Sequence, residues 1–484
     1  MLLERFYDDA LAQASYLVGC QATGEAFVLD PNRDVDPYLE AAAREGMRIV
    51  GVSETHIHAD YLSGARELAR RTGATLYLSG DGDDPEWAYR YAAEDGATLV
   101  HDGDTLEVGR LRLRVLHTPG HTPEHICFEL TDGAASNEPM GVFTGDFVFV
   151  GDVGRPDLLE TAAGVAGTME LGARALWRSL ERFRALPDYL QLWPGHGAGS
   201  ACGKALGAVP QTTLGYEKRV NWAFACAGED DFVRAVLEGQ PEPPRYFAVM
   251  KRLNRDGPPL LGAAAPPPLL PVEALDEVLA GEGLVVDLRP RGEFERGHVP
   301  GTLSIPWNRS FTTWAGWLLP YDRPIHLLAA EERHVDGAVR ALRMIGLDDV
   351  AGVFDAGALT LREARQGLRT APVVDAAEAE RARRQGAALL LDVRAASEWR
   401  EGHVPGARHI HLGRLQDRLN ELPRDERIIV HCRSGARSAI AQSLLLARGF
   451  ERVENLEGGY LAWLRAGLPV ERTEHTAGEG APVT

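Results

Sequence analysis

The sequence has few lysines, few cysteines and no long apolar run, and each shortage excludes a class of protein. No run of about 18 apolar residues occurs, so we expect no membrane-spanning helix. Residues 1–20 lack a basic segment followed by an apolar core, so we expect no secretory signal and a cytoplasmic location. Acidic residues outnumber basic ones by 70 to 51, and the net charge of −19 argues against nucleic acid or an anionic membrane as a partner.

The five cysteines are too few and too scattered for a disulfide framework, which leaves thiol chemistry or core packing. Lysine occurs only at Lys204, Lys218 and Lys251, and arginine supplies the other basic side chains. A length of 484 residues predicts roughly three domains, at about 150 residues for each.

A proline-rich break and an internal repeat divide the chain. Residues 255–270 read RDGPPLLGAAAPPPLL, which predicts a stiff, extended linker. Residues 285–305 and 390–410 have similar sequences that align without a gap. Both contain a Gly-His-Val-Pro-Gly loop, which begins at Gly297 in the first segment and at Gly402 in the second. Each copy combines apolar strands with short helices, so we predict two α/β units with parallel sheets.

The N-terminal half has short β-rich runs with amphipathic helices between them, for example over residues 62–71 and 169–186, which predicts an α/β sandwich. The C-terminal end is polar and rich in glycine, which predicts a disordered tail. The predicted order is an N-terminal domain (1–255), a linker (256–270), a first repeat (271–370), a second repeat (371–470) and the tail (471–484).

Several loops in the N-terminal half place histidine or aspartate next to the ends of predicted strands. His56, His58 and Asp60 follow the apolar run 47–52. Further along the chain, glycine- and proline-bearing loops contain His121, Asp146 and His196. Imidazole and carboxylate ligands suit zinc, iron and manganese, so these loops predict a metal site. The spacing alone does not choose between His56 and His58.

These loops resemble the metallo-β-lactamase fold, over roughly residues 1–250. Most hydrolases of that fold carry His-x-His-x-Asp-His, in which the last histidine binds a second metal. Tyr61 has that position here, and a neutral phenol is a poor ligand. One metal is then expected, and two histidines with one carboxylate match the open-sided facial triad of Fe(II) oxygenases.

Within that fold the chain resembles persulfide dioxygenases. The resemblance implies one Fe(II) per chain, bound by His56, His121 and Asp146. It also implies that neighbouring side chains orient these ligands or contact the substrate, namely His58, Asp60, His196 and Tyr61.

Two further residues near these loops each have two interpretations. Arg155 either binds an anionic sulfur or thiol-carrier group or lies on the surface. Cys202, in a glycine-rich run after His196, either relays a sulfane sulfur at the metal pocket or is a solvent-facing thiol. The remaining histidines and cysteines of this half are interpreted as structural: His101, His117, His125, Cys20, Cys127 and Cys226.

The second repeat places Cys432 between a buried strand, residues 428–431, and a helix. Backbone N–H groups and a helix N-terminus there stabilise a thiolate or a bound anion. The loop residues that would bind a sulfur anion are Arg433, Ser434, Gly435, Ala436, Arg437 and Ser438. Cysteine phosphatases need five residues between cysteine and arginine, whereas four separate Cys432 from Arg437. The loop therefore resembles that of rhodanese sulfurtransferases, in which Cys432 would carry a persulfide sulfur.

In the first repeat Ala329 aligns with Cys432, so no nucleophile remains. We interpret this repeat as a degenerate rhodanese-like domain that acts as a spacer or docking surface.

The whole chain resembles bacterial fusions that clear hydrogen sulfide. The resemblance implies that a low-molecular-weight thiol persulfide and O₂ give sulfite at the iron, and that Cys432 transfers sulfur to sulfite to form thiosulfate, or the reverse. We also expect a homo-oligomer. The alternatives are a glyoxalase II-like thioester hydrolase with a rhodanese passenger and a non-enzymatic persulfide carrier or scaffold. No motif identifies the thiol carrier, whether glutathione, coenzyme A, bacillithiol or mycothiol.

Overall fold

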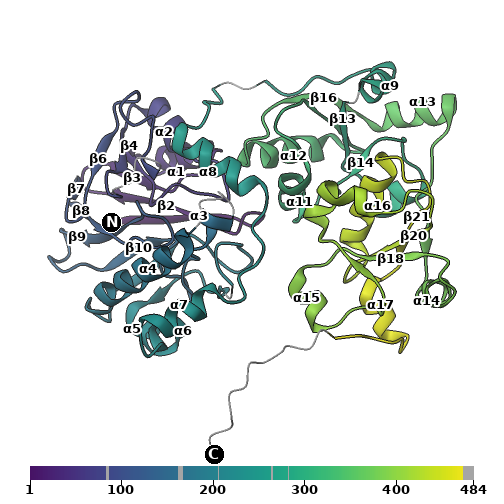
Figure 1. Ribbon diagram of the computed structural model, residues 1–484. Coiled ribbons are helices and arrows are strands. Elements are labelled where there is room, and N and C mark those ends of the chain that lie inside the picture. The colour runs from purple at the N-terminus through teal and green to yellow at the C-terminus, as the bar shows by residue number, and fades with distance from the viewer. Residues whose placement is uncertain (83–86, 162–166, 205, 263–264, 282, 473–484) are drawn as a thin grey trace, which may run out of the picture. The chain divides into compact units, whose positions relative to one another are not determined.

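The computed structural model describes residues 1–82, 87–161, 167–204, 206–262, 265–281 and 283–472 (Figure 1). The chain divides into two compact units: unit 1 is Met1–Ala265 with Arg340–Leu347, and unit 2 is Pro266–Val339 with Asp348–Thr484. Among the described residues, no helix has both the length and the apolar character that crossing a membrane requires. The predicted tail lies outside the described residues from residue 473 onward.

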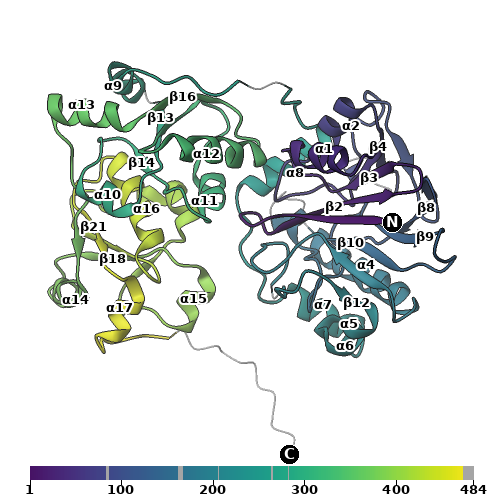
Figure 2. The ribbon, with the colours of Figure 1, turned by 180° about the vertical axis from the view of Figure 1, so that it is seen from behind.

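Unit 1 is a sandwich of two six-stranded sheets with helices on the outer faces (Figure 2). The first sheet contains, in spatial order, β1 (Leu2–Asp8), β2 (Gln13–Cys20), β3 (Glu25–Leu29), β4 (Arg48–Ser53), β5 (Thr75–Ser79) and β6 (Thr98–Val100). The second contains β12 (Thr212–Thr213), β11 (Gln191–Pro194), β10 (Gly141–Gly145), β9 (Ile126–Asp132), β8 (Leu111–His117) and β7 (Thr105–Val108). The helices are α1 (Asp36–Arg44), α2 (Ala65–Thr72), α3 (Leu158–Thr161), α4 (Thr168–Arg184), α5 (Leu214–Val220), α6 (Trp222–Ala225), α7 (Glu229–Leu237) and α8 (Tyr246–Asp256).

Alternating apolar residues build the core between the two sheets. Leu113 of β8 is buried among side chains of the opposite sheet such as Phe27, while its neighbour Arg114 is exposed. Leu68 of α2 and Leu176 of α4 belong to the clusters that pack helices on the first and second sheet respectively. The αββα sandwich predicted from the sequence is confirmed.

The carboxyl ends of β8, β10 and β11 lie at the same edge of the second sheet, because β10 is parallel to β11 and antiparallel to β9, which is antiparallel to β8. At this edge a backbone hydrogen bond of 2.7 Å from Ala14 to Gly195 joins the two sheets. The loops that carry histidine and aspartate therefore meet at one end of the sandwich.

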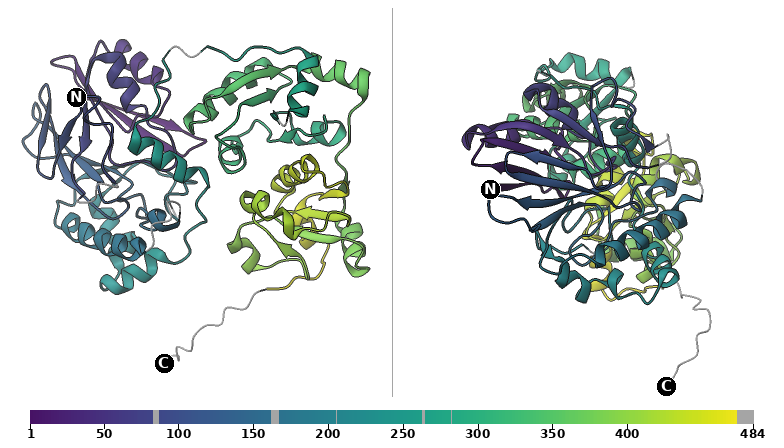
Figure 3. Two further views of the ribbon diagram at one scale, coloured as in Figure 1. Left: turned by 45° about the horizontal axis from the view of Figure 1, so that its top comes forward. Right: turned by 90° about the vertical axis from the view of Figure 1, so that its left-hand side faces the viewer.

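Unit 2 contains two all-parallel sheets with helices around them (Figure 3). The first has the order β14 (Leu303–Ser304), β13 (Leu284–Asp287), β15 (Ile325–Leu328) and β16 (Val350–Phe354), with α9 (Val272–Ala280), α10 (Arg291–Arg296), α11 (Phe311–Leu318), α12 (Glu332–Met344) and α13 (Ala356–Gln366). The second has the order β17 (Val373–Val374), β21 (Val453–Leu456), β20 (Ile428–His431), β18 (Leu389–Asp392) and β19 (Arg408–His409), with α14 (Ala376–Arg384), α15 (Ala396–Glu401), the 3-10 helix η2 (Leu412–Glu421), α16 (Ala436–Ala447) and α17 (Gly459–Arg465). The predicted parallel sheets are confirmed.

The Asp-x-Arg turn that both repeats retain is a buried ion pair. Arg289 Nη2 lies 2.6 Å from Asp287 Oδ2 and donates to the carbonyl of Gly297. In the second repeat, Arg394 Nη2 lies 2.6 Å from the carboxylate of Asp392 and donates to the carbonyl of Gly402. The pair ties the first strand to the Gly-His-Val-Pro-Gly loop, so its presence in both repeats has a structural reason.

Replacing Asp392 or Asp287 by alanine is expected to lower the unfolding free energy of unit 2 by about 3–5 kcal/mol, because each change leaves a buried guanidinium unpaired. Urea unfolding of the full chain measures this loss. The control is Glu273→Ala, which removes an exposed pair with Arg365 and should cost much less. Losses of similar size in all three variants would contradict the expectation.

Candidate functional site

The structure brings His56, His121 and Asp146 together at the end of the sandwich. His56 follows β4, His121 lies in the loop after β8, and Asp146 directly follows β10. The Nε2 atoms of His56 and His121 lie 3.9 and 3.6 Å from Asp146 Oδ2. All three side chains are buried, and their potential ligand atoms lie within 4.8 Å of one another.

The donor atoms of this group fit a metal ion. His56 Nε2 and both carboxylate oxygens of Asp146 are buried without a hydrogen-bond partner, which is unfavourable unless something else satisfies them. Burial holds the pKa of His56 and of His121 well below the usual range, so both imidazoles keep a lone pair to donate. Their other ring nitrogens are held by Thr55 Oγ1 at 3.0 Å and by the carbonyl of Arg155 at 2.8 Å, as metal-binding histidines usually are.

The structure distinguishes His56 from His58, which the spacing left open. His58 Nε2 lies 3.2 Å from Asp30 Oδ1, and its ring packs against Tyr61 with centroids 4.5 Å apart. Burial alone would lower the pKa of His58, but the carboxylates of Asp30, Glu54 and Asp60 together outweigh this and raise it to about 9. The Tyr61 hydroxyl donates to the carbonyl of Asp30, and burial raises its pKa well above the usual range. Tyr61 is therefore a neutral phenol that packs beside the histidine loop.

A second group of potential ligands contains Asp60, His196 and Cys202, whose ligand atoms also lie within 4.8 Å of one another. His196 Nε2 lies 3.2 Å from Asp60 Oδ2 and 3.4 Å from Asp146 Oδ1, so this group adjoins the first. Cys202 is buried, and the alternative of a solvent-facing thiol is wrong. Burial, with the nearby carboxylates of Asp60 and Asp146, raises the pKa of the Cys202 thiol well above its usual range.

The surface alternative for Arg155 is also wrong, because its side chain is 1% exposed. Arg155 Nε and Nη2 donate to the two carboxylate oxygens of Asp157 at 2.7 and 2.6 Å, and Nη1 donates to the carbonyl of Ala201. These partners already neutralise the guanidinium, so we do not retain Arg155 as an anion-binding residue.

Residues outside the motifs position the histidine loop. Asp30, in a left-handed conformation with φ 51°, accepts hydrogen bonds from the backbone N–H and the hydroxyl of Thr55. Asn254 of α8 donates to the carbonyls of His58 and Tyr61, both at 2.8 Å. Sequence reasoning missed both residues; the only signal was that Asp30 ends a predicted strand run.

The histidines and cysteines interpreted as structural have structural partners. His125 Nε2 accepts a hydrogen bond from the N–H of Asp146 at 3.2 Å, His117 contacts the carbonyl of Pro123, and His101 pairs with Asp81. Cys20 and Cys127 are buried in the core, as predicted, and Cys226 is partly buried at its edge.

In unit 2, Cys432 directly follows β20 and lies in the loop before α16. The thiol is buried; its Sγ accepts a hydrogen bond from the N–H of Gly435 at 3.2 Å and lies 3.5 Å from the hydroxyl of Ser438. Gly435 has φ 94°, in the left-handed region that favours glycine, and this turns the loop into the helix. Ala329 follows β15 as Cys432 follows β20, so the first repeat has no thiol at this place.

The predicted anion-binding arginines of the loop differ in their partners. Arg437 pairs with both carboxylate oxygens of Glu398, at 2.6 and 2.8 Å. Arg433 is exposed and lines a pocket of about 470 Å³ together with Arg394 and Tyr460. Arg433 is thus the more accessible cation beside Cys432 for an anionic acceptor.

The first repeat contacts Asn455, whose side chain supports the Cys432 loop. Asn455 Nδ2 donates to Gly435 O at 3.1 Å and to Glu295 Oε1 of α10 at 3.5 Å. Asn455 Oδ1 lies 2.6 Å from the Ser438 hydroxyl. The repeat without a nucleophile therefore reaches the residues that shape the loop.

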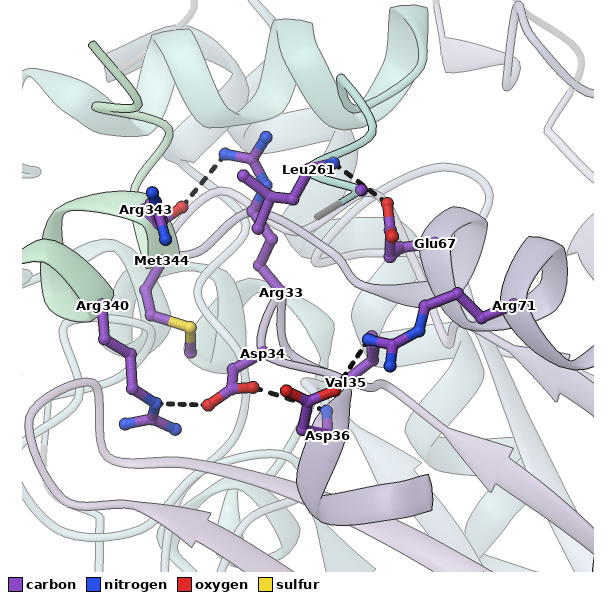
Figure 4. Close-up of a pocket in the computed structure, with 11 residues that line it drawn as sticks. Arg33, Asp34, Val35, Asp36, Glu67, Arg71, Leu261, Arg340, Arg343 and Met344 are labelled. Carbon is purple, nitrogen blue, oxygen red and sulfur yellow. Dashed lines mark hydrogen bonds and ion pairs between the residues drawn. The ribbon is translucent and has the colours of Figure 1, made fainter. Parts of the chain in front are cut away.

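Unit 1 also has a hollow of about 650 Å³ that is lined by none of the predicted site residues. Figure 4 shows the side chains that line it. Arg340 pairs with Asp34, and Arg71 with Asp36. Arg33 donates to the carbonyls of Arg343 and Pro259. The charged groups of this hollow largely satisfy one another.

Comparison with known proteins identifies both parts of the chain. The model of the metallo-beta-lactamase superfamily matches residues 8–196, and that of the rhodanese-like domain matches residues 375–466. A solved structure described as a metallo-beta-lactamase from Staphylococcus aureus subsp. aureus COL is 44% identical, with a TM-score of 0.66; the match covers 73% of this chain and 99% of that one. This chain belongs to the metallo-beta-lactamase superfamily.

The metallo-beta-lactamase domain is followed by a rhodanese-like domain at the C-terminal end. A hydroxyacylglutathione hydrolase from Rhodospirillum rubrum is 34% identical over 37% of this chain and 60% of its own length. A sulfurtransferase from Allochromatium vinosum is 41% identical over 18% of this chain and 80% of its own length. The fold of the superfamily implies a metal site, and the group His56, His121 and Asp146 fits one.

Proposed function

We propose that this chain oxidises a low-molecular-weight thiol persulfide at the metal site and transfers persulfide sulfur at Cys432. The first reaction is RSSH + O₂ + H₂O → RSH + SO₃²⁻ + 2 H⁺, and the second is RSSH + SO₃²⁻ → RSH + S₂O₃²⁻, or its reverse. The observation that carries the proposal is the presence, in one chain, of a buried His/His/Asp group and a persulfide-type cysteine loop.

At the first site, His56, His121 and Asp146 would hold one Fe(II). When bound, ferrous iron supplies the one-electron chemistry with O₂ that no side chain of this protein provides. The chain orients the histidines through Thr55 and the Arg155 carbonyl and keeps the ligands away from bulk water by burial.

At the second site, the Cys432 thiolate attacks the outer sulfur of RSSH, an S–S bond forms at Cys432, and RSH leaves. The Gly435 N–H and the Ser438 hydroxyl lie where they stabilise negative charge on sulfur. Sulfite then takes the outer sulfur, the S–S bond breaks, and the thiolate is restored. One chain that carries both sites raises the effective concentration of sulfite at the second.

The decisive experiment measures O₂ consumption by the Fe(II)-loaded chain against a panel of persulfides, with sulfite and thiosulfate both quantified. Sulfur transfer converts sulfite to thiosulfate, so the two products are counted together. We expect about one O₂ consumed for each sulfite or thiosulfate formed. No O₂ uptake with any persulfide would refute the dioxygenase reaction. It would leave Cys432 to be tested separately, by sulfur transfer from thiosulfate to cyanide.

A thioester hydrolase is the second candidate, and the group Asp60, His196 and Cys202 favours it because it offers ligands for a second ion. The hydroxyacylglutathione hydrolase among the relatives points the same way. Two zinc ions per chain with thioester cleavage and no O₂ uptake would establish this candidate, whereas one iron per chain with O₂ uptake would exclude it.

Glu295 of the first repeat is expected to support sulfur transfer through Asn455. Glu295→Ala should lower the rate of thiosulfate-to-cyanide transfer about fivefold, which corresponds to about 1 kcal/mol for one hydrogen bond. Glu295→Gln should restore most of the rate, because an amide oxygen also accepts from Asn455. Glu293→Ala on the same helix is the control, and a native rate in Glu295→Ala would show that the first repeat does not influence the loop.

A further inference from the structure

Lys251 is a buried cation without a hydrogen-bond or ion-pair partner among the described residues. Its side chain is 3% exposed, and Nζ has no hydrogen-bond partner. No carboxylate of the described residues lies within ion-pair distance of it, in contrast to Lys218, whose Nζ lies 2.5 Å from Asp188. Nζ lies over the ring of Trp87, 5.3 Å from its centroid, in a cation–π contact that offsets only part of the cost of burial. Burying an ammonium in this way is unfavourable unless an anion joins it.

Lys251 faces the metal loop. It lies on α8 three residues before Asn254, and side chains three apart share one face of a helix. Asn254 donates to the carbonyls of His58 and Tyr61 and accepts from the N–H of Ser63, so that face of α8 packs against the histidine loop.

The charge of Lys251 also reaches the candidate ligands. After burial, it is the largest influence that lowers the pKa of His121, and Asp146 is among the charges that raise the pKa of Lys251. Burial lowers the pKa of Lys251 itself to about 8, so the ammonium form predominates at pH 7.

Glu124 contacts the same loop, where its Oε1 accepts from the N–H of Ile57 at 2.8 Å. The other carboxylate oxygen of Glu124, Oε2, is buried without a hydrogen-bond partner. Burial raises the pKa of Glu124 and the charge of Lys251 opposes this rise, although the two side chains form no ion pair. Beside the metal cluster, Lys251 therefore offers a hydrogen-bond donor without a partner, and Glu124 offers an acceptor without a partner.

We propose that Lys251 binds an oxyanion of the ligand at the metal site, either a carboxylate of the thiol carrier or sulfite, with Glu124 accepting a hydrogen bond from the same ligand. This inference rests on the proposed function only for the choice of anions. The sequence could not indicate it, because Lys251 belongs to no motif.

The test compares thermal unfolding of the full, metal-loaded chain with and without ligand, for the native protein and for Lys251→Met, Lys251→Arg and Lys218→Met. The probes are sodium sulfite and S-methylglutathione, which carries carboxylates but no free thiol. We expect at least one probe to raise the Tm of the native chain by 2 °C or more. A shift of about this size is expected when the ligand concentration is some tens of times its Kd. Sulfite alone would identify the product as the ligand, and S-methylglutathione would identify the carrier.

The shift should fall by at least half in Lys251→Met and persist in Lys251→Arg and Lys218→Met. Without ligand, Lys251→Met should be at least as stable as the native chain, because it removes an unpaired buried charge. The proposal is overturned if neither probe shifts the native Tm, if Lys251→Met responds as the native chain does, or if Lys251→Met alone is strongly destabilised. Because this measurement needs no O₂ and no turnover, it can fail while the proposed oxidation holds, and the reverse.

Discussion

Replacing Cys432 by serine is expected to abolish thiosulfate formation while O₂ consumption and sulfite release continue. Serine keeps the shape of the loop, but its oxygen cannot form the S–S bond that carries the transferred sulfur. Loss of a nucleophile of this kind costs at least about 10³-fold in rate. The measurement is thiosulfate and sulfite quantified from the same reaction, together with thiosulfate-to-cyanide transfer.

Cys226→Ser is the matched control, because Cys226 is half-buried at the edge of the core and its thiol donates to the carbonyl of Trp222. It should form thiosulfate at the native rate. Thiosulfate formation by Cys432→Ser at a native rate would place sulfur transfer elsewhere. A carrier that only delivers persulfide to partner proteins would show no O₂ uptake even in the native chain.

Replacing Asp146 by asparagine is expected to abolish O₂ consumption while sulfur transfer at Cys432 continues. The amide has no negative charge and is a weak ligand, so the iron content should fall well below one per chain and O₂ consumption by at least about 100-fold. Sulfur transfer at Cys432 should persist, because Asp146 lies in unit 1 and Cys432 in unit 2. Metal analysis and both assays on the same preparation measure this.

His117→Ala is the control for the metal site, since His117 contacts the carbonyl of Pro123 and belongs to neither group of potential ligands. Its iron content and O₂ consumption should match the native values. Native iron content in Asp146→Asn would show that the ion is held by other residues, and the group Asp60, His196 and Cys202 would then be the next to examine.

Much of the fold follows from local signals. The strand over residues 428–431 occurs with the bounds that its apolar run predicts, because a parallel strand buried on both faces reads as a continuous apolar run. The helices predicted over 62–71 and 169–186 occur as Ala65–Thr72 and Thr168–Arg184, with ends shifted by up to three residues. Helix ends shift because caps and tertiary contacts decide the last turn.

Side-chain partners were harder to predict, because they come from distant parts of the chain. The spacing could not choose between His56 and His58, and the choice depends on Asp30, which binds His58 from 28 residues away. Arg155 proved to be neutralised by Asp157, although its position after Asp146 suggested a free cation. Cys202 is buried although its run of small residues suggested exposure.

The sequence by itself indicated a metal site and a reactive cysteine loop, because both are short local motifs at strand ends. It also showed that lysine is scarce, but not that Lys251 is buried without a hydrogen-bond partner. Only the tertiary structure showed this burial, since the helix α8 that carries Lys251 packs through Asn254 against His58, 196 residues away. A buried charge and its missing partner are properties of packing, and packing joins residues that no local pattern connects.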